Sequence, residues 1–114
     1  MIEIREITQD VYRALTQCER NVFPLVAPEG TGLPFVVFER SNMYETPTKD
    51  GGELEIGFTV RIVTATYFDG LTIVDHIRTE FRHFQSHYGY KPRLTGATEE
   101  YTTDGYVQSL TFTF

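Results

Sequence analysis

The chain of 114 residues has a single cysteine, Cys18, and no long apolar run. One cysteine excludes an internal disulfide and any zinc site built from several cysteines. No window approaches the roughly 18 continuous apolar residues of a membrane-spanning helix, and the charged residues 1–15 contain no apolar stretch typical of a secretory signal. The sequence therefore predicts no membrane association, and it is consistent with a reducing compartment.

Positive charge is also scarce. Sixteen acidic residues outnumber ten basic ones, giving a formal net charge of −6, and the basic residues form no cluster in the sequence. Proteins that grip nucleic acid through its phosphates need such clusters. A protein that grips nucleic acid through its phosphates is therefore excluded. A protein past which nucleic acid moves without being bound is not excluded. The length favours a single domain, residues 1–114, and the apolar content of 40% is ordinary for a globular protein.

The proline- and glycine-containing segment VFPLVAPEGTGLPFVVFER, residues 22–40, raises the question of a phosphate-binding loop. Such a loop needs a glycine followed by lysine and serine or threonine at the start of a helix. Here Gly32 is followed by Leu33, Pro34 and an apolar run typical of a strand. Residues that precede proline favour extended backbone. We therefore expect no nucleotide cofactor, but a stiff, turned lead that delivers residues 35–38 into a sheet.

Apolar periodicity predicts the first elements. Apolar residues at steps of three and four indicate an amphipathic helix over residues 3–17, and Thr8 leaves open a start near residue 8. Strict alternation predicts a long strand over residues 53–65. It would pair with a strand over residues 34–44 as a long antiparallel hairpin, joined by a polar turn region at 45–52.

A second helix and a second hairpin complete the expected fold. Asp69-Gly70 precedes a helical pattern over residues 71–87, and Tyr88-Gly89 ends it. A closing hairpin turns around Asp104-Gly105. Tyr106, Gln108, Leu110, Phe112 and Phe114 share the face of Thr95, Ala97, Glu99 and Tyr101 whether the turn has two residues or four, so the sequence leaves the exact register open. The fold class is α+β, in the order α-β-β-α-β-β. We expect a mainly antiparallel sheet of four or slightly more strands, two helices on one face, and a long hairpin arm.

Candidate chemistry is sparse. His76, Glu80, His83 and His87 share one helical stripe, and the last two histidines have a spacing that metals can bridge. This stripe borders the apolar one, however, and no cysteine or carboxylate cluster completes a ligand shell, so a solvated helix flank is the favoured interpretation. Cys18 lies on the apolar side of its helix, where a thiol behaves as a small hydrophobe. We predict no catalytic residue, no metal, no cofactor and no enzymatic activity.

Tyrosine is the most suggestive residue type. Six of the seven tyrosines fall at predicted strand ends and turns. Such positions are common at protein–protein contacts, because the ring buries area while the hydroxyl stays hydrated. Packing at the rim of the sheet explains them equally well, and both interpretations remain open.

The order of elements, the segment from Pro28 to Val37 and the final DGYVQSLTFTF resemble the small tail completion, or tail-terminator-like, proteins of tailed phages and prophages. The resemblance implies a ring, usually of six subunits, that caps the tail tube and joins it to the head connector. Its partners would be further copies of itself, the major tail tube protein and the connector proteins, with DNA passing through unbound. It also implies location in the virion tail after assembly in the bacterial cytoplasm.

For this role, the expected subunit contacts lie on the hairpin turn and the sheet ends, at Tyr44, Lys49, Asp50, Tyr67, Tyr101 and Tyr106. The alternative is a monomeric or dimeric α+β module that binds a small ligand or a peptide.

Overall fold

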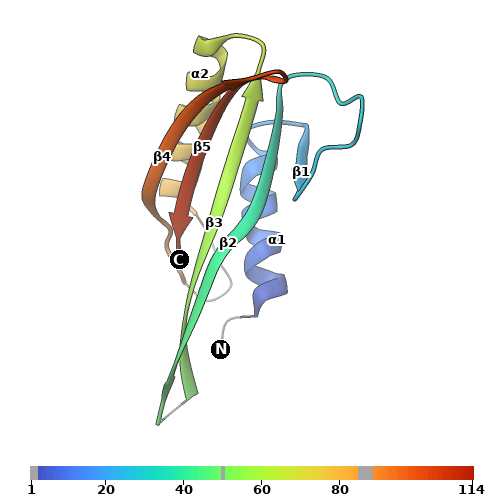
Figure 1. The fold of residues 1–114 in the computed structure, drawn as a ribbon. Helices are drawn as coiled ribbons and strands as arrows, with labels where there is room; N and C mark the ends of the chain where they lie inside the picture. The colour runs from blue at the N-terminus through green and yellow to red at the C-terminus, as the bar shows by residue number, and fades with distance from the viewer. Residues whose placement is uncertain (1–2, 50, 85–88) are drawn as a thin grey trace.

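The computed structural model describes residues 3–49, 51–84 and 89–114 (Figure 1). Its elements are α1 (Ile4–Thr16), β1 (Val22–Pro24), β2 (Phe35–Thr48), β3 (Gly51–Thr64), α2 (Tyr67–Arg82), β4 (Arg93–Thr102) and β5 (Gly105–Thr113). The strands form a five-stranded sheet in the order β1-β2-β3-β5-β4. The predicted α+β class, two helices and two hairpins are confirmed. The sheet is mixed rather than antiparallel throughout, because β1 pairs parallel to β2.

Both helices cover the same face of the sheet (Figure 1). On this face the buried residues of β3 alternate as predicted, from Ile56 to Ile62, and they pack with Ile7 of α1 and Ile77 of α2 in one apolar core. The ring of Phe81 on α2 lies 4.3 Å from that of Phe112 on β5. The core thus ties the second helix to the centre of the sheet.

The first helix begins at Ile4, so the alternative start near residue 8 is wrong. Glu3 occupies the N-cap position without a side-chain cap. Instead of capping, the Thr8 hydroxyl donates to the carbonyl of Ile4 one turn back, at 2.6 Å. Burial of the apolar face explains why the helix forms from its first turn without a cap.

The lead before β2 is turned, as expected, but it also contains a strand that the sequence did not reveal. Residues Val22–Pro24 pair with Val36–Phe38. Beyond them, Gly30 has a φ of 83° and the Thr31 amide donates to the carbonyl of Pro28 at 3.1 Å, which closes a turn. This edge strand is fixed by pairing with a distant segment rather than by its own three residues.

The first hairpin is longer than predicted. β2 and β3 stay paired to Thr48 and Gly51, so most of the turn expected at residues 45–52 is strand. Pro47 fits because this part of β2 has β3 as its one neighbour among the described strands. Residues 43–55 project past the rest of the sheet, and we call them the hairpin arm (Figure 1).

The second helix is shifted towards the N-terminus relative to the prediction. It begins at Tyr67, because the Thr66 side chain caps it by accepting from the Asp69 amide at 3.3 Å. Asp69-Gly70 therefore lies in the first turn rather than before the helix. The helix ends at Arg82, where the amide of His83 bonds to the carbonyl three residues back and tightens the last turn. Tyr88, predicted at the helix end, lies outside the described residues.

The closing hairpin turns around the predicted residues, with Thr102 opposite Gly105, and of the registers that the sequence leaves open it adopts the one in which Tyr101 opposes Tyr106. The predicted sharing of one face holds at Glu99 and Ala97, which oppose Gln108 and Leu110. It is wrong further on, where an irregularity between Leu94 and Gly96 places Leu94, not Thr95, opposite Phe112. One extra residue in β4 explains the change, since a bulge moves every later pair by one.

Candidate functional site

Three of the predicted interface residues lie together at one end of the sheet. The ring of Tyr106 lies 4.9 Å from that of Tyr101 and 6.0 Å from that of Tyr67. The β4–β5 pairing brings the first two together, and the capped start of α2 delivers the third. The exposed ring of Phe68 packs edge-on against Tyr67 at 5.5 Å. We call these four residues the tyrosine cluster.

A carboxylate anchors this cluster. The Tyr67 hydroxyl donates to Glu99, at 2.9 Å from Oε2 and 3.2 Å from Oε1, and the Gln108 amide nitrogen donates to Oε2 at 3.1 Å. The hydrogen bond to Glu99 is the main cause of a raised pKa of Tyr67. Tyr101 and Phe68 are 73% and 75% exposed. Fixed, exposed aromatic rings are typical of a surface that contacts another protein.

Two other predicted interface residues lie at the opposite end. Tyr44 and Lys49 belong to the hairpin arm, and Asp50 lies outside the described residues. The sheet register separates the two groups: Tyr106 opposes Thr64 at one end of β3, whereas Tyr44 opposes Glu55 near its other end. Tyr44 is 64% exposed. The five of these residues that the structure describes therefore do not form one site but mark two separate surfaces.

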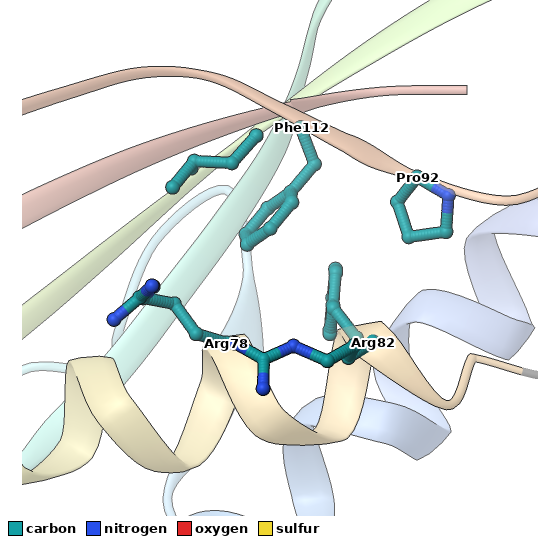
Figure 2. A pocket seen from close by; sticks show the side chains of 6 residues that line it. Arg78, Arg82, Pro92 and Phe112 are labelled. Carbon is teal, nitrogen blue, oxygen red and sulfur yellow. The ribbon is translucent and has the colours of Figure 1, made fainter.

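A third surface was not predicted. Arg78 and Arg82 of α2 stand on one side of a cavity of about 200 Å³, and Pro92 and Phe112 lie on the other side (Figure 2). Phe81 and Leu94 complete its lining, and no acidic residue lines it within the described part of the chain. The i, i+4 spacing of Arg78 and Arg82 is the signal in the sequence that could have indicated it. We call this site the arginine-rimmed pocket.

The histidine stripe does not form a ligand set among the residues described. His76 and His83 are exposed, His83 lies past the end of the helix, and His87 is outside the described residues. No group of three or more His, Cys, Asp and Glu side chains gathers closely enough for a metal in the described ranges.

Cys18 is half-buried, as its place on the apolar side of α1 predicts. Its thiol donates to the carbonyl of Ala14 at 3.7 Å. Burial, with a smaller contribution from Glu80, raises the pKa of the thiol to about 11. A thiol with so little thiolate near neutral pH is a poor nucleophile.

The cavities at the tyrosine cluster and at the arginine-rimmed pocket are small. The cavity beside Tyr67 and Tyr106 has about 250 Å³ and the arginine-rimmed pocket about 200 Å³. Both fall below the roughly 300–1,000 Å³ of typical small-molecule sites. Neither described helix has the length and apolar character needed to cross a bilayer.

No family model matches the sequence, and no curated protein matches it either. Solved structures do match. A chain from the virion of a native gene transfer agent particle superposes with a TM-score of 0.78 over 96% of this chain and 92% of that one. The sequence identity is 13%, so the agreement is one of fold. The chain therefore has the fold of a protein found in a virion particle.

Proposed function

We propose that the chain is a structural, non-enzymatic component of the virion of a phage or phage-like particle. Its role would be that of a ring subunit, six to a ring, that caps the tail tube and joins it to the head connector. The observation that carries this proposal is the fold shared with a gene transfer agent virion chain over nearly the full length of both chains. The resemblance of residues 28–37 to tail completion proteins points the same way.

The shape of the molecule supports assembly with further copies. The molecule measures 50 × 24 × 22 Å, and the hairpin arm projects along its length (Figure 1). Past Phe38, β2 has only β3 as a partner among the described strands, so the arm offers free backbone groups at its edge. A projecting element that fits a different surface of the next copy makes a head-to-tail contact, which closes into a ring when the rotation permits.

The charge balance supports passage of DNA without binding. With a net charge of −6, the chain repels phosphates on average, and carboxylates around a lumen would keep the genome from sticking in transit. The partners would be the neighbouring copies, the major tail tube protein and the head–tail connector. Assembly would take place in the bacterial cytoplasm and end in the virion tail.

One observation favours the alternative, a peptide-binding module that acts as a monomer or dimer. The outer edge of β4 is unpaired within the described residues and lies beside the exposed Tyr101. An extended peptide can add to such an edge as a further strand. This function predicts binding without closed assemblies.

Sedimentation velocity over a wide concentration range, followed by negative-stain electron microscopy, separates the two functions. The tail role predicts closed rings or stacked rings with an open centre. A homodimer with a defined internal cavity, or a chain that stays monomeric while it binds peptides, would contradict it.

A further inference from the structure

Two surfaces of the molecule carry opposite charge. The hairpin arm, residues 43–55, contains four acidic residues and one basic residue. The arginine-rimmed pocket lies on the body, between the end of α2 and the start of β4, and Lys91 and Arg93 flank Pro92 at its edge. In a chain with a net charge of −6, this is a local concentration of positive charge.

The pocket combines an apolar floor with charged walls. The floor includes Phe112, whose ring lies 4.3 Å from that of Phe81, and Leu94, which is 44% exposed. The side chain of Arg78 is 47% exposed and pairs with the exposed Asp75 at 3.3 Å. Arg82 rises from the same side of the helix (Figure 2). Such a site fits a protruding apolar group with a carboxylate next to it.

The arm presents this combination. Residues directly opposite each other on paired strands share a face, so Glu45 and Leu54 lie on one side of the arm, together with Met43, which opposes Ile56. Met43 is 42% exposed and Glu45 is exposed. Glu53 and Glu55 add negative charge on the other side. The face that carries Met43 and Glu45 is apolar near the body and acidic towards the tip.

We propose that the arginine-rimmed pocket receives the hairpin arm of a second copy of this chain. Met43 would pack on the floor at Leu94 and Phe112, and Glu45 would pair with Arg78 and Arg82. The arm projects away from its own body (Figure 1), so the contact is between molecules. It joins two different surfaces, as a ring requires. This docking deepens the proposed function and rests on it.

A charge-swap experiment on the full-length chain tests the docking. Glu45→Lys with Glu53→Lys reverses the net charge of the arm, and Arg78→Glu with Arg82→Glu reverses the charge of the pocket. Because like charges then face each other, each variant alone should self-associate about tenfold or more weakly than the unmodified chain, by sedimentation equilibrium at up to about 1 mM. An equimolar mixture of the two variants should recover association, and so should the chain with all four substitutions.

The matched control is Arg5→Glu with Arg20→Glu, two exposed arginines on and just after α1 with the same charge change. It should associate as the unmodified chain does, and circular dichroism confirms that every variant is folded. Closed rings that form equally well in every charge-swap variant would overturn the docking but not the ring function. Association that weakens in each variant and recovers in their mixture, but that forms no closed rings, would support the docking and overturn the ring function. An unmodified chain that is monomeric at all concentrations overturns both.

Discussion

The hydroxyl of Tyr67 lies 2.9 Å from one oxygen of Glu99 and 3.2 Å from the other, and this pair fastens the first turn of α2 to β4. It holds one of the predicted interface tyrosines beside the two others. The raised pKa of Tyr67 is a direct signature of the contact. Ionisation of the phenol removes the proton through which it hydrogen-bonds to the carboxylate, so the contact favours the neutral phenol.

Titration of Tyr67 should therefore reveal the pair. Its ring signal, followed by nuclear magnetic resonance, should show ionisation above the ordinary value of 10.0. Glu99→Gln should lower this pKa towards the ordinary value, since it replaces the carboxylate that accepts the Tyr67 hydrogen bond, the largest cause of the shift, with a neutral amide. The matched control is Glu100→Gln, the neighbouring carboxylate on the opposite face of the strand. An unchanged titration in Glu99→Gln would show that the contact is absent in solution.

Gly105 should resist substitution. Its φ is 140°, and a Cβ built there would lie 2.5 Å from the carbonyl oxygen of Thr64. Gly105→Ala should therefore lower the free energy of unfolding by about 2 kcal/mol or more, measured by urea denaturation. Gly32→Ala is the control, because nothing lies within 4 Å of a Cβ at that position. Equal effects of the two substitutions would contradict the described turn.

Cys18 should alkylate slowly. With a thiol pKa of about 11 instead of 9.0, the thiolate fraction at pH 8 is about 100-fold lower than that of an unperturbed thiol. The rate of reaction with iodoacetamide should keep rising with pH well beyond 9. Glu80→Gln should shift the profile only slightly, since burial is the larger cause. A plateau above pH 9 would show that the thiol is accessible.

The tip of the hairpin arm should be dispensable for folding. Glu45 and Leu54 are paired residues, so an Asn-Gly turn can join them directly in place of residues 46–53. Thr46, Pro47, Lys49, Gly52 and Glu53 are exposed. The free energy of unfolding should therefore change by less than about 1 kcal/mol. A shortened chain that unfolds much more readily would show that the tip supports the body.

Elements with their own periodicity were predictable from the sequence. The alternation from Leu54 to Ile62 specified both the strand and its buried face, and the turn around Asp104-Gly105 placed Tyr101 and Tyr106 on one face of the hairpin. The parallel strand Val22–Pro24 was not predictable, because its three residues become a strand only by pairing with β2. The hairpin likewise continues through Pro47, since pairing across the strands outweighs local propensity.

The candidate surfaces show the same division. Tyr101 and Tyr106 of the cluster share one face of the closing hairpin, which the sequence predicts, but Tyr67 joins them only through the packing of α2. The arginine-rimmed pocket needs Phe112 from β5 beside Arg78 and Arg82 from α2 (Figure 2), and no local pattern predicts that meeting. Surfaces built by tertiary contacts were therefore missed or only partly found.

The most direct test of the proposed role is electron microscopy of the self-assembled chain, averaged to a resolution that shows strands. We expect a closed ring around an open centre, six copies to a turn, with each arm seated against Arg78 and Phe112 of the next copy. A two-fold dimer without a lumen would contradict the ring, and a ring whose arms touch no neighbour would contradict the docking.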